Sequence, residues 1–326
     1  MLRKILFLLL CCDLLLLANP LVDLYRTKGI SAVEDEINKS LQDVNYWKKA
    51  LLDEDLRFGY LSNFDYVLVS HKSDFNLEVF KKSGSKKYDK IFNSKILVGQ
   101  ASGDKQIEGD LKTPVGVYEL VRKNTNVDPF YGPLALVTSY PNLFDTSLGK
   151  NGHGIWIHGV PEASQRDNFT QGCIAMENDA LLKLDGLIDF QKSILLINEN
   201  EFTQTNIDDI SSIFASIYAW QNSWKMNDLN TYLSFYDDGF LRVKQGGIKE
   251  DYNSFKRYKS IIFGRNERKQ IVFSDINIIP YPNIGKKKLF KIEMQQDYWA
   301  PSFQSSGKKT LYVELKNGKI SILTES

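Results

Sequence analysis

The spacing of apolar residues changes twice along the chain, and these changes limit the folds that it can adopt. At 30–51 apolar residues recur every three or four positions, which predicts one face of a helix that begins near Ser31. At 65–199 short strand-like runs alternate with turn-forming residues. A polar stretch at 199–206 then precedes amphipathic runs and a second set of strands. The sequence therefore predicts a helical segment followed by two further regions.

The middle region is predicted to be mainly β. Its strand-like runs are separated by turn-forming residues, and one helix is expected to begin near Asn178. The predicted strands lie at 66–70, 76–80, 95–99, 115–120, 134–137, 155–158 and 194–197.

The last region is predicted to be α+β. Three amphipathic runs predict helices, the second of which has Asp228 as its cap. Four later runs with glycine and Asn-Gly turns predict an antiparallel meander, so the helices should pack on one curved sheet. The helices are expected at 210–224, 228–236 and 252–263, and the strands at 271–279, 289–298, 310–315 and 320–323.

The first eighteen residues have the pattern of a secretion signal. Arg3 and Lys4 make a positively charged start, and residues 5–18 are largely leucine. Asp13 interrupts the apolar run, which is also too short to cross a bilayer comfortably. We therefore expect a signal peptide at 1–18, no stable membrane span in the mature chain, and a periplasmic location.

Charge gives no sign of a nucleic-acid partner. The chain has 41 basic and 40 acidic side chains, and removal of residues 1–18 leaves equal numbers of each. Binding through nucleic-acid phosphates needs a basic excess. We therefore expect no nucleic-acid partner and assign the short lysine runs to solvated turns.

One cysteine remains once the first eighteen residues are removed, Cys173, in the segment Gln-Gly-Cys-Ile-Ala-Met at 171–176. A single thiol cannot form an internal disulfide, so stability must come from apolar cores. A thiolate rather than a thiol attacks a carbonyl, so a catalytic cysteine needs a nearby base. The predicted base is His158, fifteen residues earlier.

The choice of histidine depends on strand geometry. His153 and His158 are five residues apart, so they point to opposite faces if the strand is regular from 153 to 158. His158 is followed by Gly159 and a polar loop that returns to Cys173, which favours His158. His71 comes just after the first predicted strand and is expected to be exposed.

Two interpretations of this pair remain open on spacing alone. In the first, Cys173 is a nucleophile, and the backbone at Gly172 and Cys173 directs N–H groups toward an oxyanion. In the second, Cys173 is an inert buried residue and His158 is a hydrogen-bonded residue at a strand end. Neither needs a metal, and the three histidines and one thiol have no zinc-site spacing, so we expect no cofactor.

Three motifs favour the catalytic interpretation by resemblance. Residues 109–118 (Gly-Asp-Leu-Lys-Thr-Pro-Val-Gly-Val-Tyr), 157–159 (Ile-His-Gly) and 172–174 (Gly-Cys-Ile) resemble the motif set of the L,D-transpeptidase catalytic domain, or YkuD family. The resemblance covers roughly residues 64–199 and implies a β-sandwich fold. It also implies that Cys173 is the nucleophile, His158 the base, and a peptidoglycan stem peptide the substrate.

The chain departs from that family pattern on both sides of the cysteine. The family usually has Ser or Thr two residues before the cysteine, whereas this chain has Gln171 directly before Gly172, and Thr170 lies one place further off. The family usually has arginine two residues after the cysteine, whereas this chain has Ala175. Loss of a guanidinium removes a group that could orient the site or bind a substrate carboxylate, and Arg166 in the loop is a candidate replacement. The candidate substrate-binding residues are Gly159, Trp156, His153, Arg166 and Thr170.

The last region resembles the NTF2-like cone fold, on the segments 218–221 (Tyr-Ala-Trp-Gln) and 228–236. Such a cone can hold a small ligand or glycan, or only mediate contacts. The order of parts resembles the L,D-carboxypeptidases that set cell shape in helical Gram-negative bacteria. The expected parts are a signal peptide at 1–18, a helical segment at 19–62, a catalytic domain at 63–200 and an NTF2-like domain at 205–326.

This resemblance implies a hydrolase that trims stem tetrapeptide to tripeptide. The same acyl-enzyme could instead be resolved by an amine, which would make a crosslink or attach a protein. A third interpretation is a binding module with an inactive catalytic domain. The motifs do not distinguish water from an amine, and only the order of parts favours water.

The apolar stripe at 30–51 predicts an association surface. No second helix lies beside it in the sequence, so we expect residues 20–60 to form a homodimer contact. The competing interpretation is that the stripe packs on the β domain of its own chain.

Overall fold

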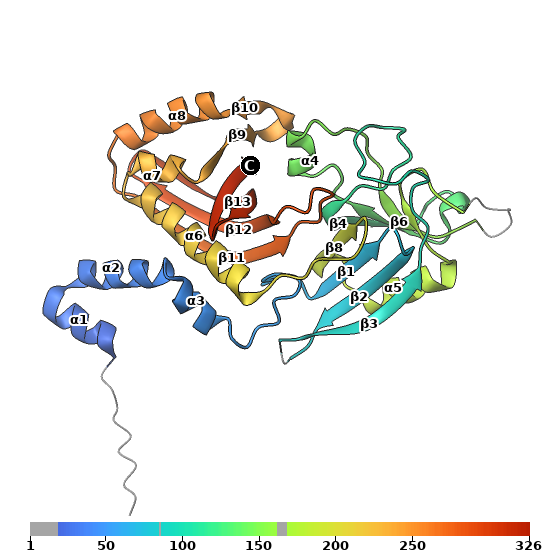
Figure 1. The fold of residues 1–326 in the computed structure, drawn as a ribbon, viewed down its shortest axis with the longest axis horizontal. Coiled ribbons are helices and arrows are strands. Elements are labelled where there is room, and N and C mark those ends of the chain that lie inside the picture. Colours follow the sequence, from blue (N-terminus) through green and yellow to red (C-terminus); the bar gives the residue numbers. More distant parts are fainter. Residues whose placement is uncertain (1–18, 85, 162–167) are drawn as a thin grey trace, which may run out of the picture.

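The structure is a computed structural model that describes residues 19–84, 86–161 and 168–326, and its N-terminal segment forms three helices (Figure 1). These are α1 (Pro20–Lys28), α2 (Ile30–Leu41) and α3 (Val44–Ala50). The predicted single helix at 30–51 was therefore wrong. Asp43 begins α3 by accepting a hydrogen bond from the Asn45 N–H (2.8 Å), and α1 is a further helix that the sequence analysis missed.

The apolar stripe packs in part on its own chain, on the last domain rather than on the β domain. Trp47 of α3 stacks on Phe214 (ring centroids 4.2 Å apart) and Tyr218 (5.5 Å), both on α6 (Ile207–Lys225). Ile30 and Ile37 stay 61% and 41% exposed. The stripe is thus divided between an internal contact and an open surface.

The middle region forms one eight-stranded sheet in the order β3-β2-β1-β8-β4-β5-β6-β7. Most of its contacts are antiparallel, but β1 pairs in parallel with β8 and β6 in parallel with β7. The strands are β1 (Tyr66–His71), β2 (Asn76–Lys82), β3 (Tyr88–Lys95), β4 (Gly116–Asn124), β5 (Ala135–Thr138), β6 (Trp156–His158), β7 (Ile174–Ala175) and β8 (Ser193–Asn198), with α4 (Leu143–Ser147), α5 (Asn178–Leu187), η1 (Pro129–Tyr131) and η2 (Phe190–Lys192).

One predicted strand of this region was wrong, and one predicted helix was confirmed. Residues 95–99 form no strand, because the chain leaves β3 at Lys95 and makes only isolated bridges, from Leu97 to Ala175 and from Gly99 to Thr170. Its apolar residues are buried in a connection instead. The helix expected near Asn178 is α5.

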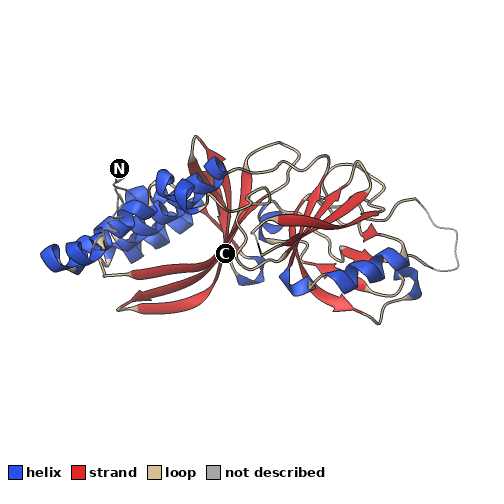
Figure 2. Ribbon diagram, turned by 90° about the horizontal axis from the view of Figure 1, so that it is seen from below, coloured by secondary structure: helices blue, strands red, loops and turns tan. Residues whose placement is uncertain are grey.

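The last region forms a six-stranded sheet with helices on one face (Figure 2). The predicted meander was confirmed, and Asp228 caps α7 by accepting from the Thr231 N–H (3.0 Å). The sequence analysis missed β9, where a helix was expected to continue to residue 236. The elements are α6, α7 (Leu229–Leu233), β9 (Tyr236–Val243), η3 (Gln245–Gly247), β10 (Lys249–Asp251), α8 (Tyr252–Gly264), β11 (Gln270–Pro280), β12 (Leu289–Ala300), β13 (Phe303–Lys316) and β14 (Lys319–Glu325).

The two sheets share an apolar core. Phe144 of α4 stacks on Tyr312 of β13 (5.2 Å) and meets Tyr281 edge-on (5.4 Å). Asn142 donates a hydrogen bond to the Tyr281 hydroxyl (3.0 Å). Because this core contains residues of both domains, including Val67 and Ile194, the domains are held in one arrangement.

A partly buried ionic contact between the two domains involves Glu119. Glu119 of β4 accepts from Lys291 of β12 and Lys308 of β13, each at 3.1 Å. Burial alone would raise the pKa of Glu119, but the two ammonium groups lower it to about 2.

Among the described residues, no helix has the length and apolarity needed to cross a membrane.

Phe144→Ala tests the shared core. Removal of a buried ring leaves a cavity between two tyrosines, so we expect the free energy of unfolding in urea to fall by about 3–5 kcal/mol. The control Phe303→Ala removes a ring that is 59% exposed and should cost no more than about 0.5 kcal/mol. Equal effects of the two substitutions would contradict a shared core.

Candidate active site

The pairing of β6 with β7 brings the predicted nucleophile and base together. The strands run in parallel, with Ile157 opposite Ile174 and His158 opposite Ala175. Cys173, one residue before β7, is therefore level with Trp156. Side chains alternate along a strand, so the fully buried isoleucines face the core, and Cys173 and His158 share the other face as diagonal neighbours.

Thr170 shapes the turn before Cys173. Its hydroxyl donates to the Cys173 carbonyl (2.7 Å) and accepts from the Gly172 N–H (3.0 Å). Thr170, a candidate substrate-binding residue, is thus part of the turn itself. Of the two N–H groups expected to serve an oxyanion, that of Gly172 donates to Thr170, and the Cys173 N–H remains the candidate donor.

Gly172 is required by the backbone at this turn. Its φ is 137°, in a region that L residues rarely adopt, and a Cβ there would lie 2.8 Å from the Lys112 carbonyl oxygen. Lys112 belongs to the Gly-Asp-Leu-Lys-Thr-Pro segment. This segment therefore packs against the turn that carries the cysteine. Thr113 of the same segment accepts a hydrogen bond from the Gly99 N–H (2.8 Å).

The thiol is half-buried and electrostatically controlled. Its Sγ lies 3.3 Å from the Gly154 carbonyl oxygen, to which it donates. Burial raises the pKa of Cys173, while a hydrogen bond from the Trp156 N–H and the positive charge of Lys105 act in the opposite direction. Thiolate formation therefore depends on these two groups and on a base.

His158 is oriented by a carbonyl. Its Nδ1 lies 2.7 Å from the Gly159 oxygen, and since a carbonyl only accepts, Nδ1 carries the proton and Nε2 can take up another. The edge of Tyr131 packs on the imidazole ring (5.0 Å, 89°). Tyr131 was missed from the sequence because it lies in η1, far from both motifs along the chain.

Lys105 was also missed, and it is held by the motif aspartate. It is 4% exposed and donates to Asp110 (2.8 Å). Partial burial would raise the pKa of Asp110, but Lys105 and nearby backbone N–H groups lower it to about 2. With alanine at 175, Lys105 is a cation whose charge acts on Cys173. No motif in the sequence singled out Lys105, because only the fold brings it near Cys173.

The two other histidines lie outside the strand that carries His158. His153 lies in an exposed loop, because β6 begins only at Trp156; the assumption of a regular strand from 153 was therefore wrong. His71 ends β1, where its Nδ1 lies 3.3 Å from the Asn200 oxygen. Arg166 lies outside the described residues.

Gly159 and Trp156 lie beside His158 along the chain, and Trp156 is level with Cys173. Gly159 is buried against Gly132 and Asn178, and a Cβ there would overlap the Asn178 side chain. Asn178 also bonds both backbone groups of Val160, at 2.8 and 3.0 Å. Trp156 is partly exposed and packs on Tyr131 (5.1 Å), so it lines the open side of the site.

Comparisons with known proteins agree with this geometry. The L,D-transpeptidase catalytic domain (YkuD) model matches residues 65–190, and the Cds6 C-terminal NTF2-like domain model matches 212–326. The helical cell shape determining protein Pgp2 of Campylobacter jejuni is 40% identical, with a TM-score of 0.80 over 87% of this chain and 99% of that structure. The chain belongs to the L,D-transpeptidase (YkuD) family. It is thus a cysteine-dependent enzyme of the L,D-transpeptidase type with a peptidoglycan-related function.

Other relatives share part or all of this organisation. A point variant of Pgp2 matches with a TM-score of 0.83 over 88% of this chain. Bd1075 of Bdellovibrio bacteriovorus is 25% identical over 81% of this chain and 92% of that structure, with a TM-score of 0.62. YafK of Escherichia coli (strain K12), named as an L,D-transpeptidase, is 31% identical over 111 residues. The chain spans 42% of the length of that curated relative.

The described part of this YkuD-family chain offers no cluster of three or more histidine, cysteine, aspartate or glutamate residues for a metal ion. Its chemistry can be derived from the thiol, the imidazole and the backbone donors. A thiolate on Cys173 with a proton acceptor beside it can attack an acyl carbon and carry the acyl group.

Lys105→Gln tests the electrostatic control of the thiol. A positive charge favours the thiolate, so its removal should raise the apparent pKa of Cys173 and slow iodoacetamide alkylation near neutral pH about three- to tenfold. Lys105→Arg keeps the charge and should stay close to the wild type, as should Lys123→Gln, whose partner is Asp185. An unchanged pH profile in Lys105→Gln would contradict the role of Lys105.

Proposed function

We propose that this protein is a periplasmic peptidoglycan L,D-carboxypeptidase that removes the terminal D-alanine from the stem tetrapeptide. The observation that carries the proposal is the β6–β7 register, which sets Cys173 diagonally beside His158 on one face. Cys173 acts as the nucleophile and His158 as the base.

The reaction runs through a thioester. His158 Nε2 takes the Cys173 proton, and the sulfur attacks the carbonyl carbon of meso-diaminopimelate, the third stem residue. The oxyanion faces the Cys173 N–H. When the C–N bond breaks, the imidazolium returns its proton to the departing D-alanine amine. Water then attacks the thioester with His158 as base, so that the tripeptide and the free thiol are released.

Water is preferred over an amine because of the organisation of the whole chain. This chain has helices, a YkuD domain and an NTF2-like domain in that order, and it covers 99% of the structure of Pgp2, which is named as a cell-shape determinant. We propose that this protein also contributes to cell shape. Residues 1–18, which fall outside the described residues, would direct export to the periplasm as a signal peptide.

The NTF2-like cone is proposed to hold a small ligand or glycan in its interior. Lys259 is buried there, with its Nζ 4.5 Å from the Trp224 ring centroid, and burial lowers its pKa to about 7. Lys309 pairs with the buried Glu325 (2.9 Å). Among the described residues the Trp224 indole N–H has no hydrogen-bond partner, so the interior has polar groups to offer a ligand.

Substitution of the catalytic pair tests the reaction. Cys173→Ala, Cys173→Ser and His158→Ala should each lower D-alanine release from disaccharide tetrapeptide at least about 10³-fold at neutral pH, with little loss of stability. His153→Ala is the matched control and should cost less, because His153 lies in an exposed loop. Products are weighed by mass spectrometry. A new crosslinked dimer without tripeptide would assign the protein as a transpeptidase, and activity in Cys173→Ala would contradict the mechanism.

The homodimer is proposed to form through residues 20–60, by way of the apolar side chains of α1 and α2 that remain exposed. Leu21, Val22 and Tyr25 of α1 are 37%, 55% and 57% exposed, next to Ile30 and Ile37 of α2. A contiguous apolar surface of this kind is typical of an association site.

The double substitution Ile30→Glu, Ile37→Glu should give a folded, active monomer in light scattering, because charge on both copies opposes a symmetric contact. Ile261→Glu, at a residue of α8 that is 65% exposed, should leave the assembly unchanged. If the wild-type chain is monomeric at high concentration, the dimer proposal is wrong.

A further inference from the structure

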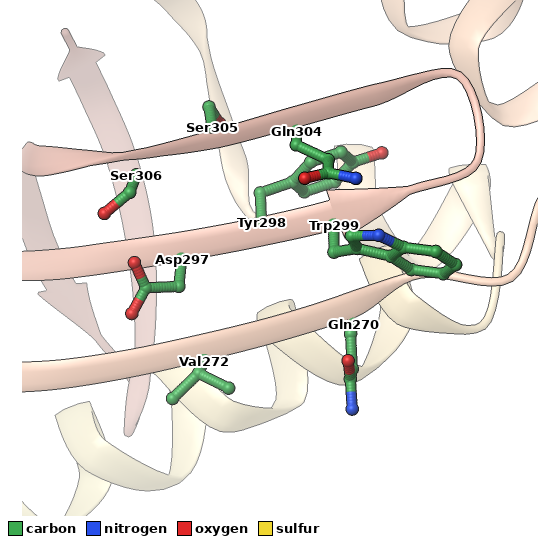
Figure 3. Close-up of a pocket in the computed structure, with 8 residues that line it drawn as sticks. All are labelled: Gln270, Val272, Asp297, Tyr298, Trp299, Gln304, Ser305 and Ser306. Carbon is green, nitrogen blue, oxygen red and sulfur yellow. The ribbon is translucent and has the colours of Figure 1, made fainter.

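The C-terminal sheet carries a shallow pocket of about 330 Å³, on strands β11, β12 and β13 (Figure 3). On β12 the side chain of Tyr298 faces the helices, where it packs on Trp224 (5.3 Å). Side chains alternate along the strand, so Asp297 and Trp299 face the opposite side. The pocket is lined by Gln270, Val272, Asp297, Tyr298, Trp299, Gln304, Ser305 and Ser306.

An exposed indole lies at the centre of this pocket. Trp299 is 41% exposed, and it is paired across the sheet with Gln270 on β11 and Gln304 on β13. The next row on this face contains Asp297 between Val272 and Ser306. With strands about 4.8 Å apart and alternate residues about 6.8 Å apart, the two rows cover about 10 by 7 Å. This area matches one or two sugar rings.

The polar side chains around the indole are not used by the fold. Among the described residues, the side chains of Gln270, Asp297, Gln304 and Ser305 have no hydrogen-bond or ion-pair partner; only the Ser306 hydroxyl does, accepting from Gln295 (2.9 Å). Two amides and a carboxylate therefore flank the indole and are available to a ligand, whereas Ser305 is paired with Tyr298 and faces the other side of the sheet.

The charge of the pocket selects the class of ligand. Asp297 is its one charged lining residue, and no lysine or arginine lines it. An anionic ligand, such as a phosphate or the carboxylates of a stem peptide, would be repelled and would find no cation. A pyranose ring is uncharged, has C–H groups on one face that pack on an indole, and has hydroxyl and acetamido groups at its edge that bond amides and carboxylates.

We propose that this pocket binds the glycan strand of peptidoglycan, as uncharged β-linked N-acetylated sugars. The inference relies on the proposed function only to identify the polymer that supplies the sugars. Binding does not involve the cone interior, because the indole of Trp299 and the side chain of Tyr298 lie on opposite faces of β12.

The same face of β12 continues to the catalytic domain. Beyond Gln295 and Glu293 it reaches Lys291, which bonds Glu119 on β4. Trp299 and Lys291 are eight residues apart, or about 27 Å along the strand. Because the shared core holds the two domains in one arrangement, a glycan bound at Trp299 would be held at a defined distance from the catalytic domain.

The test is binding of two uncharged probes by the chain from residue 19 onward: the β-1,4-linked tetramer and the β-1,4-linked hexamer of N-acetylglucosamine. Trp299→Ala should weaken binding of both on the order of tenfold, and Gln304→Ala should weaken it about fivefold. Phe303→Ala, on the same sheet but outside the pocket, is the matched control and should bind like the wild type. Trp299 and Gln304 are surface residues, so the variants should fold, as circular dichroism will check.

Activity separates this inference from the proposed function. Trp299→Ala should release D-alanine from soluble disaccharide tetrapeptide at the wild-type rate and from intact sacculi more slowly. Equal glycan binding by Trp299→Ala and the wild type, no binding by either, or binding only of free stem peptide would overturn the inference. Glycan binding that is lost in Trp299→Ala, in a protein that releases no D-alanine, would support the pocket while the proposed function failed.

Discussion

The parallel pairing of β6 with β7 is the contact on which the candidate active site depends. The two strands pair at only two positions, Ile157 with Ile174 and His158 with Ala175. The two isoleucines are fully buried, and this determines which face of each strand points to the core. Alternation then puts His158 and Cys173 on the other face. A slip of one residue would turn the thiol into the core, so apolar packing on one face determines the chemistry on the other.

The remainder of the site is built from segments that are distant along the chain. The Gly-Asp-Leu-Lys-Thr-Pro segment supports the turn at Gly172, and through Asp110 it holds Lys105, whose charge acts on the thiol. Burial disfavours the thiolate, and this cation and a backbone N–H favour it. Burial is the larger effect and raises the pKa of Cys173, but the two groups that oppose it are fixed in place before substrate arrives.

The second domain is attached rigidly. Phe144 packs between Tyr281 and Tyr312, and Glu119 is paired with Lys291 and Lys308. A flexible linker would let the domains move independently, whereas a common core of aromatic rings does not. Binding on the C-terminal sheet can therefore position a polymer relative to the catalytic domain without any change of shape.

Several elements and both candidate residues could be predicted from patterns within single segments of the chain. Apolar spacing placed α5 and the C-terminal meander, and motif order singled out Cys173 and His158, which the structure sets on neighbouring strands. The sequence-based predictions were wrong for segments whose structure depends on contacts with other parts of the chain. The run at 95–99 is buried in a connection instead of a strand, and the stripe at 30–51 is broken before Asp43 and packs on α6.

The residues that act on the thiol from distant parts of the chain could be identified only from the folded structure. Lys105 and Tyr131 reach the pair from other loops, and the Gly172 N–H is taken by Thr170. The spacing of apolar residues indicates which side chains of a segment will be buried, because this spacing can be read within that segment alone. Strand pairing, strand register and the electrostatic field at the Cys173 sulfur each depend on several segments together. They are therefore set only when the chain folds.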